Sequence, residues 1–126
     1  MKKIINTPNA PAPIGPYNQA VLYGNMLYTS GQVAMHPETG ELITDDIARE
    51  TEMVMQNLKA ILTEAGTTFE NVIKASIFIS DMNNFKAINK VYGAYFNEAT
   101  APARETVEVA NLPLYVNVEI SMIAFV

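Results

Sequence analysis

Residues 103–109 alternate in the way that is typical of a β-strand, and β-branched residues are frequent in them. The segment starts directly after Pro102, a position that a strand tolerates. Because side chains alternate between the two faces of a strand, Arg104 and Thr106 point to one side and Glu105 points to the other. The pattern predicts a strand that displays a guanidinium on the same side as a hydroxyl.

A second strand is predicted over residues 116–122, where one side is continuously apolar and the other is polar. Residues 110–115 connect the two predicted strands and are few enough for the strands to pair or to lie close. A guanidinium and a carboxylate on neighbouring strands can reach one cleft. We therefore expect Arg104 and Glu119 to face the same cleft.

The N-terminal third of the chain predicts short strands separated by turns. Residues 1–6 are expected to form a short strand, and residues 18–23 and 26–32 to pair as a β-hairpin around Gly24-Asn25. The single histidine, His36, falls in a turn and has no metal-type partner near it in the sequence. That context favours a solvated turn residue over a catalytic base.

Residues 7–16 contain four prolines, which restrict the backbone and remove hydrogen-bond donors, so no regular structure is expected there. An irregular segment of this length in a compact domain is often a lid or a binding loop. A passive linker is about as consistent with the pattern. The sequence leaves both interpretations open.

Two helices are predicted, with a strand between them. Residues 45–65 carry apolar side chains at helical spacing, with two aspartates at the favourable N-terminal end and Gly66 placed to end the helix. Residues 71–80 are largely apolar and predict a central strand. A second helix is expected after a cap at Asp81 or Asn83. Its predicted buried stripe consists of Phe85, Ile88, Tyr92, Tyr95 and Phe96.

The order of these elements predicts a single α+β domain over residues 1–126, with one mixed β-sheet and both helices packed on one face. Two helices cannot cover both faces of such a sheet. The uncovered face is expected to carry Ile123 and Phe125 beside Asn117, Glu119 and Ser121. Because this mixed surface is poorly solvated by itself, we expect identical subunits to close it in a cyclic homo-oligomer.

Composition narrows the classes of function. Hydrophobic residues make up 49% of the chain and charged residues 17%, which is typical of a globular protein with room for a subunit interface. The net charge of −5 makes a nucleic-acid partner unlikely, because such binding needs clustered Lys and Arg. The lack of cysteine excludes disulfides and a thiol nucleophile, and it fits a cytoplasmic location. No apolar run approaches the length of a membrane span, so no membrane partner is expected.

Several short segments together carry a resemblance to a known family. They are Ile14-Gly15-Pro16-Tyr17, Thr29-Ser30-Gly31-Gln32, Asn89-Lys90-Val91-Tyr92, Ala101-Pro102-Ala103-Arg104, Thr106-Val107 and Val118-Glu119-Ile120. The chain resembles the reactive intermediate deaminase (Rid, YjgF-type) family, and within it the RidA branch. The resemblance runs the whole length of the chain, and its most specific part is the Pro-Ala-Arg segment followed at this spacing by Val-Glu-Ile.

The resemblance implies a chorismate-mutase-like α+β fold of the bacillus type and a homotrimer with active-site clefts between subunits. It also implies hydrolysis of reactive 2-imino and 2-enamino acids, such as 2-iminobutanoate and 2-iminopropanoate, to 2-oxo acids and ammonia. The implied reaction uses no cofactor and no metal. In that family the reactive species escape from pyridoxal-phosphate-dependent enzymes such as threonine or serine dehydratase.

The residue types agree with this chemistry. A planar guanidinium is the side chain best shaped to hold a substrate carboxylate through two parallel hydrogen bonds, so Arg104 is the expected anchor. A protonated C=N carbon is already electrophilic, and water can attack it without a covalent nucleophile. Glu119 is the candidate residue that orients this water and takes its proton.

The other expected site residues bind the substrate. They comprise backbone groups near Gly31 and Thr106, the hydroxyls of Ser30 and Thr106, and Tyr17, which is expected to close the pocket from the proline-rich segment. By resemblance, Asn89 also lines the cleft. The competing interpretation makes Arg104 and Glu119 a simple cross-strand ion pair, which contributes little at a surface.

Four positions depart from the family pattern. Thr106 stands where many members have cysteine, and since the hydrolysis needs no thiol, we expect a change in substrate fit rather than in chemistry. Glu105 stands where a small residue is common, but alternation turns it to the opposite face. Leu114-Tyr115 replaces a usually charged pair, with an expected effect on the pocket rim or on a partner surface.

Two further function classes remain open beside the enzyme. A binding module would use the same arginine-lined cleft to sense a small carboxylate, such as a 2-oxo acid, without turnover. An RNA-directed activity, attributed to some relatives, is opposed by the acidic balance of the chain.

Overall fold

The computed structural model describes residues 1–126 and has an α+β architecture built on one six-stranded sheet. The strand order is β1-β2-β3-β6-β4-β5. Neighbouring strands are antiparallel except for β4 and β5, which are parallel, so the sheet is mixed. The strands are β1 (Lys3–Ile5), β2 (Ala20–Tyr23), β3 (Met26–Thr29), β4 (Val72–Ile79), β5 (Ala103–Glu108) and β6 (Val118–Phe125).

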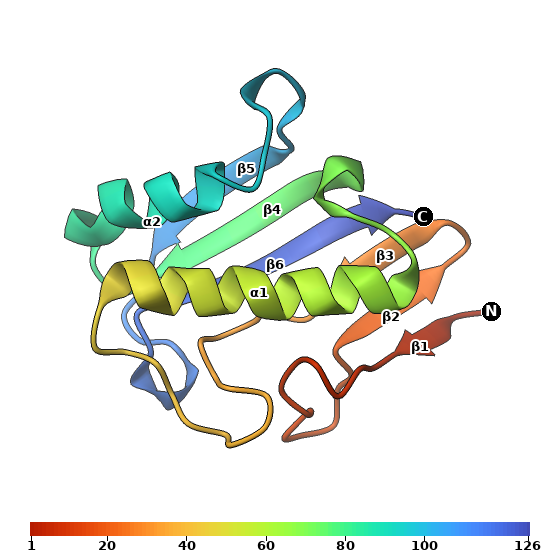
Figure 1. Ribbon diagram of the computed structural model, residues 1–126, viewed down its shortest axis with the longest axis horizontal. Helices are drawn as coiled ribbons and strands as arrows, with labels where there is room; N and C mark the ends of the chain where they lie inside the picture. Colours follow the sequence, from red (N-terminus) through yellow and green to blue (C-terminus); the bar gives the residue numbers. More distant parts are fainter.

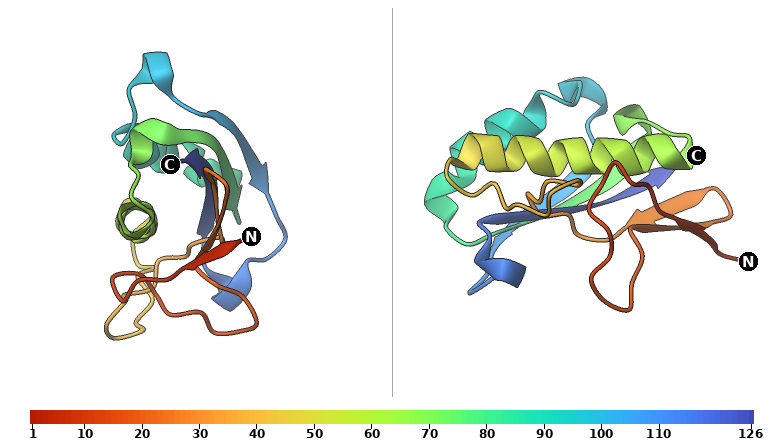
Figure 2. Two further views of the ribbon diagram at one scale, coloured as in Figure 1. Left: turned by 90° about the vertical axis from the view of Figure 1, so that its right-hand side faces the viewer. Right: turned by 60° about the horizontal axis from the view of Figure 1, so that its bottom comes forward.

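Both helices, α1 (Ile47–Ala65) and α2 (Phe85–Gly93), lie on the same face of the sheet (Figure 1). The left view of Figure 2 shows α1 end-on against that face, with the strands seen nearly edge-on. Twenty buried residues form one hydrophobic core, which α1, α2 and the sheet supply together. The predicted mixed sheet with two helices on one face is therefore confirmed.

The helix ends follow from local chemistry. Asp46 caps α1, because its carboxylate accepts a hydrogen bond from the backbone N–H of Arg49 at 3.0 Å. Gly66 ends this helix with a φ of 84°, a left-handed conformation that glycine adopts without strain. The second helix ends at Gly93, so Tyr95 and Phe96 lie beyond it rather than on its predicted stripe, although both still pack against the core.

The expected neighbourhood of the last two strands is wrong, because β4 lies between β5 and β6. Helix α2 connects β4 to β5 as a crossover, and such a connection returns the chain parallel to the strand it left. Strand β5 therefore takes the edge of the sheet beside β4. Strand β6 is inserted between β3 and β4, where it pairs antiparallel with both.

The register places Arg104 and Glu119 on opposite faces of the sheet. Arg104 is level with Ala75 and Met122, which are buried under the helices. Glu119 is level with Phe78, on the face that the helices leave open. The expectation that the two side chains of one chain face the same cleft is therefore wrong.

The start of β6 also differs from the prediction. The strand begins at Val118 rather than at residue 116 and continues to Phe125. Asn117, which was expected on the open face, instead donates hydrogen bonds to Glu50 of α1. Asn117 therefore ties the start of the strand to a helix.

Candidate active site

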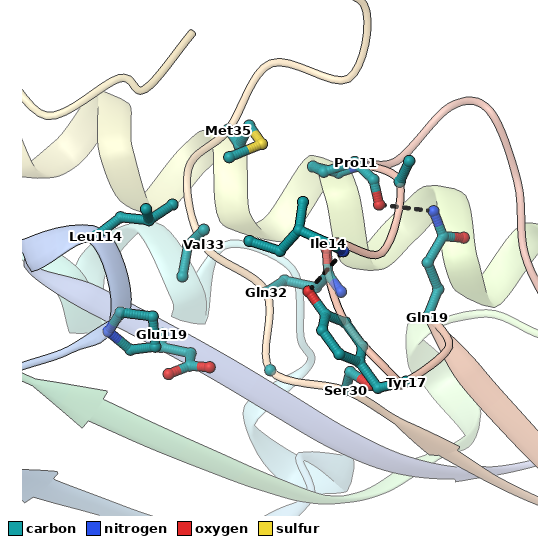
Figure 3. Close-up of a pocket in the computed structure, with 13 residues that line it drawn as sticks. Pro11, Ile14, Tyr17, Gln19, Ser30, Gln32, Val33, Met35, Leu114 and Glu119 are labelled. Carbon is teal, nitrogen blue, oxygen red and sulfur yellow. Dashed lines mark hydrogen bonds between the residues drawn. The ribbon is translucent and has the colours of Figure 1, made fainter. Parts of the chain in front are cut away.

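Four of the expected site residues, Tyr17, Ser30, Gly31 and Glu119, line one cavity of about 400 Å³ (Figure 3). Three irregular segments enclose it: the proline-rich segment, the residues that follow β3, and the short 3₁₀ turn η4 (Pro113–Tyr115) before β6. Much of its lining is apolar and comes from Pro11, Ile14, Val33, Met35, Pro113 and Leu114. The cavity thus combines one carboxylate with apolar walls.

Gln19 holds the proline-rich wall in shape. Its side chain is only 2% exposed, and its Oε1 accepts a hydrogen bond from the backbone N–H of Thr7 at 2.7 Å. Its Nε2 lies within hydrogen-bond distance of the carbonyls of Thr7, Ala10 and Pro11, at 3.0, 3.2 and 2.9 Å. The amide supplies the partners that prolines cannot supply to one another. The sequence left two interpretations of residues 7–16 open, a lid or binding loop and a passive linker. In the structure this segment forms a wall of the cavity and is not a detached linker.

Asn57 holds a second wall from the core side. This residue of α1 is 1% exposed, and its Nδ2 donates to the carbonyls of Val33 and Met35 at 3.2 and 3.0 Å. Sequence reasoning missed both amides. Gln19 has a weak signal, its position two residues after Tyr17, whereas Asn57 falls within an ordinary amphipathic helix and has none.

Glu119 lies directly over Gly31. A β-carbon at residue 31 would overlap the carboxylate group and the Cγ of Glu119, so the position accepts only glycine in this arrangement. The carboxylate of Glu119 takes part in no hydrogen bond or ion pair within the chain, and burial raises the pKa of this group above the ordinary value. A raised pKa means that this carboxyl group keeps its proton to a higher pH than a solvent-exposed glutamate does.

Two hydroxyls line the same cavity as this carboxylate. Ser30 Oγ donates to the carbonyl of Asn18 at 2.5 Å, which leaves its oxygen able to accept a further hydrogen bond. The hydroxyl oxygen of Tyr17 accepts from the backbone N–H of Ile14 at 3.4 Å, and the two side chains lie next to each other in Figure 3. Tyr17 is thereby part of the proline-rich wall.

Arg104 belongs to a different group of residues, on the helix-covered side of β5. Its Nη1 donates to Asn89 Oδ1 at 2.6 Å, and its guanidinium carbon lies 5.1 Å from the ring centre of Tyr92 and 5.8 Å from that of Phe85. These contacts orient the guanidinium by hydrogen bonding and cation–π attraction. No carboxylate pairs with it, since the ion pairs of the chain are Arg49–Asp45 and Lys74–Glu105. The cross-strand ion-pair interpretation of Arg104 and Glu119 is therefore wrong.

Thr106 and Tyr92 flank this arginine group with hydroxyls that have no partner in the chain. Both oxygens are buried. Burial raises the pKa of the Tyr92 hydroxyl to about 12, against the opposing influence of Arg104, so this group stays protonated. The expected site residues thus form two groups, with Tyr17, Ser30, Gly31 and Glu119 in the cavity and Asn89, Arg104 and Thr106 beside α2.

Three of the residues that depart from the family pattern, Leu114, Tyr115 and Glu105, lie in different parts of the structure. Leu114 and Tyr115 have positive φ angles of 60° and 54°, a conformation that costs free energy for residues with a β-carbon. Leu114 lines the cavity, whereas the Tyr115 side chain is 82% exposed. Glu105 lies on the open face and pairs with Lys74 at 2.7 Å, which lowers the pKa of its carboxyl group.

His36 lies outside both groups. Its Nδ1 accepts hydrogen bonds from the backbone N–H groups of Glu38 and Thr39 at 3.2 and 3.4 Å, so it shapes its own turn. No three His, Cys, Asp or Glu side chains gather in a way that could hold a metal ion. Neither helix has the length and apolar character needed to cross a membrane.

Residues 7–126 match the protein family described as Endoribonuclease L-PSP. A RutC family protein of Synechocystis sp. is 50% identical over 123 residues, which cover 97% of this chain and 95% of that protein. A protein of Escherichia coli named 2-iminobutanoate/2-iminopropanoate deaminase is 47% identical over 126 residues, with 98% of each chain covered.

Solved structures also resemble this chain over nearly its whole length. A putative endoribonuclease of Thermotoga maritima superposes with a TM-score of 0.96 at 46% identity and covers 100% of this chain and 98% of its own. The Escherichia coli protein TdcF with bound serine superposes with a TM-score of 0.92 at 44% identity over 98% of both chains. The similarity therefore extends over the cavity and over the arginine group alike.

The contact between Gly31 and Glu119 predicts a strong coupling between the two positions. Gly31→Ala is expected to destabilise the protein by about 1–3 kcal/mol, because the new methyl group overlaps the glutamate side chain. In a Glu119→Ala background the three contacts with the glutamate side chain are absent, and the same change is expected to cost much less. Denaturant unfolding of the two single variants and the double variant measures this coupling. Equal costs in both backgrounds would contradict the contact.

The raised pKa of Glu119 predicts a defined pH dependence of stability. The folded state holds this proton more tightly than the unfolded state, so the destabilising effect of Glu119 grows as pH rises from the ordinary pKa of 4.5 through the folded value. Glu119→Gln is therefore expected to gain stability relative to wild type over that range, with no gain below pH 4.5. Melting temperatures of both proteins between about pH 4 and pH 8 measure this difference. The comparison is repeated in an Arg104→Ala background, where Arg104 of a second copy of the chain cannot lower the pKa of Glu119. A stability difference between Glu119→Gln and wild type that does not change with pH contradicts the prediction.

Proposed function

The chain belongs to the Endoribonuclease L-PSP family, which confirms its resemblance to Rid proteins, and from this membership we propose that it hydrolyses 2-imino and 2-enamino acids to 2-oxo acids and ammonia. The deaminase name of the Escherichia coli relative, at 47% identity over nearly the whole chain, supports the reaction class. The serine bound to TdcF supports a small ligand with a carboxylate. We take 2-iminobutanoate and 2-iminopropanoate as the reference substrates.

The observation that carries the proposal is an uncompensated carboxylate in a cavity. Glu119 has no cation and no hydrogen-bond donor of its own, and glycine is needed beneath it. The backbone N–H of Gly31 also has no acceptor within the chain, so it is free to donate to a ligand. A structural ion pair would leave neither group unpartnered.

The proposed mechanism divides the work between two side chains. Arg104 holds the carboxylate of the iminium substrate, oriented for this by Asn89 and by the rings beneath it. Glu119 orients a water molecule and takes one of its protons as the water oxygen bonds to the C=N carbon. Glu119 then gives this proton to the amine nitrogen of the tetrahedral carbon and takes the remaining proton of the hydroxyl group, so that the C=O bond forms, the C–N bond breaks and ammonia leaves. The raised pKa of Glu119 suits it to return the proton that it accepted.

Two copies of the chain are needed for this division, because Arg104 and Glu119 lie on opposite faces of one sheet. We propose a homotrimer in which Arg104, Asn89 and Thr106 of one subunit face the Glu119 cavity of the next. The position of β5 at the edge of the sheet and the exposed apolar side chains of the open face, among them Tyr28, Val107 and Phe125, support an assembly. The number three and the chorismate-mutase-like fold name follow from the resemblance. The proposed single domain rests on the order of the predicted elements, and the proposed cytoplasmic location rests on the lack of cysteine.

Two other functions, ligand sensing and RNA cleavage, compete with the deaminase proposal. A sensing module for 2-oxo acids needs the carboxylate anchor Arg104 but not Glu119. Cleavage of RNA, which the family description names, is opposed by the net charge of −5. Glu119→Ala separates the deaminase from the sensing module. A deaminase loses its turnover in this variant, whereas a sensing module keeps its ligand affinity and has no turnover to lose.

The deaminase activity is measured by coupling this protein to a threonine dehydratase and following 2-oxobutanoate, with semicarbazide competing for the imine. Wild type is expected to accelerate formation of the oxo acid. Arg104→Ala is expected to lose this effect, and Glu119→Gln to lower it by about 10²- to 10⁴-fold, the usual contribution of a general base. Arg49→Ala is the matched control, because it removes the other arginine from an exposed ion pair on α1. No acceleration by wild type with any imino acid refutes the enzyme.

The shared site is tested by mixing two inactive variants. Arg104→Ala and Glu119→Ala subunits, dissociated and reassembled together, are expected to regain activity, since some interfaces then combine an intact arginine with an intact glutamate. Random assembly restores about a quarter of the sites. If mixtures stay as inactive as either variant alone while mixed oligomers form, the two groups do not serve one site.

A further inference from the structure

Glu50 is a fully buried carboxylate for which the proposed mechanism has no use. It lies in the first turn of α1, has an exposed fraction of 0%, and takes part in neither ion pair of the chain. Burying an ionised group without a cation is costly unless hydrogen bonds compensate it. Glu50 therefore needs hydrogen-bond donors from its surroundings.

Both oxygens of Glu50 bind a single residue, Asn117. Oε2 accepts from the Asn117 backbone N–H at 2.7 Å, and Oε1 accepts from the Asn117 side-chain Nδ2 at 2.8 Å. Two donors on one residue require two acceptors, which a carboxylate provides and an apolar side chain does not. The N-terminal end of α1 also favours a negative charge at this place. The pair therefore forms a two-point clamp across 67 residues of sequence.

Asn117 stands where a strained turn passes into the strand that carries Glu119. Before it, Leu114 and Tyr115 of η4 hold positive φ angles. After it, β6 begins at Val118. The carbonyl of Asn117 accepts from the backbone N–H of Ser80 at 3.1 Å, which also ties it to the end of β4. A strained turn persists only when its surroundings fix both of its ends, and Asn117 is the fixed end on the β6 side.

The clamped segment supplies much of one side of the cavity, namely Pro113, Leu114 and Glu119. On the far side of Glu119, Ile120 and Gln32 exchange backbone hydrogen bonds at 2.8 and 3.1 Å. Besides its pairing with Phe78 of β4, Glu119 thus lies between two anchor points, of which the Gln32 bridge is backbone only and the Glu50 clamp depends on side-chain identity. A change at residue 50 reaches the carboxylate through one short stretch of backbone.

We propose that Glu50 is a positioning residue for Glu119, acting by fixing Asn117 and with it the turn and strand on either side. Its kinetic consequence rests on the proposed deaminase function, whereas its structural consequence does not. Loss of the clamp lets the start of β6 and η4 relax, which admits water to Glu119 and moves the carboxylate away from its position over Gly31.

The test compares Glu50→Leu, which keeps the bulk and removes both acceptors, with Glu50→Gln. Glutamine keeps an acceptor for the Asn117 N–H, and its NH2 group donates to the Asn117 Oδ1 once that side-chain amide flips. Thr51→Val is the matched control, because Thr51 is also fully buried in the same turn but its Oγ1 donates only to the carbonyl of Ile47 within the helix. The titration of Glu119 is followed by NMR in protein labelled with ¹³C at the glutamate carboxyl groups. Its resonance is assigned by its absence from Glu119→Gln.

The titrations are compared in an Arg104→Ala background, which removes the Arg104 guanidinium of a neighbouring subunit. In Glu50→Leu the pKa of Glu119 is then expected to fall toward its ordinary value, because the carboxylate becomes solvated. Glu50→Gln and Thr51→Val are expected to titrate like wild type. Turnover per folded molecule in the dehydratase assay is expected to drop on the order of 10- to 100-fold in Glu50→Leu, the usual effect of misplacing a reacting group by about 1 Å, and to stay near wild type in the other two.

An unchanged Glu119 titration in folded Glu50→Leu overturns the proposal, as does an equal shift in Thr51→Val, which makes the effect one of general stability. If Glu50→Leu does not fold, Asn117→Ala removes the side-chain half of the clamp, and a Glu119 titration identical to wild type then refutes the role. Wild type without deaminase activity refutes the proposed function alone, since the titration is read without turnover.

Discussion

The placement of β6 in the middle of the sheet is the constraint on which the rest of the structure depends. Its Val118, Ile120, Met122 and Ala124 are buried at 2% exposure or less, and they supply the sheet side of the core. Strict alternation along a strand then forces Glu119 onto the opposite face. A shift of one residue would bury the carboxylate beneath the helices and expose the apolar row. The location of the candidate base is thus a by-product of core formation, which explains why it is so firmly specified.

The same alternation explains which parts of the structure could be predicted from the sequence. Hydrophobic spacing located the helices and strands, because each pattern reflects burial on one side of an element. It also assigned Arg104 and Thr106 to one face of β5. It did not determine the neighbours of β5, because the length of residues 110–115 limits how far the strands can separate but does not select a pairing partner. The crossover through α2 selects β4 instead.

The irregular walls of the cavity were the least predictable part. Gln19, Asn57 and Glu50 are buried polar residues on regular or nearly regular segments, and each holds a loop distant in sequence. Apart from the Asn117 side-chain amide that Glu50 also binds, their partners are backbone groups, which every residue carries, so no spacing of residue types reveals them. Only the folded chain brings each donor or acceptor to its loop. Candidate site residues are easier to propose from the sequence, because guanidinium, carboxylate and glycine have chemistry that points to a role.

The four prolines of the cavity wall also act on the chain before it folds. Proline restricts the conformations of an unfolded segment, so ordering that segment loses less conformational entropy than ordering a flexible loop of equal length. With Gln19 fixing the remaining freedom, the wall is already in place when a ligand arrives. A small molecule with few atoms gains little binding free energy to spend on arranging a protein loop. Such a preorganised wall suits a short-lived ligand, because capture does not have to wait for the loop to order.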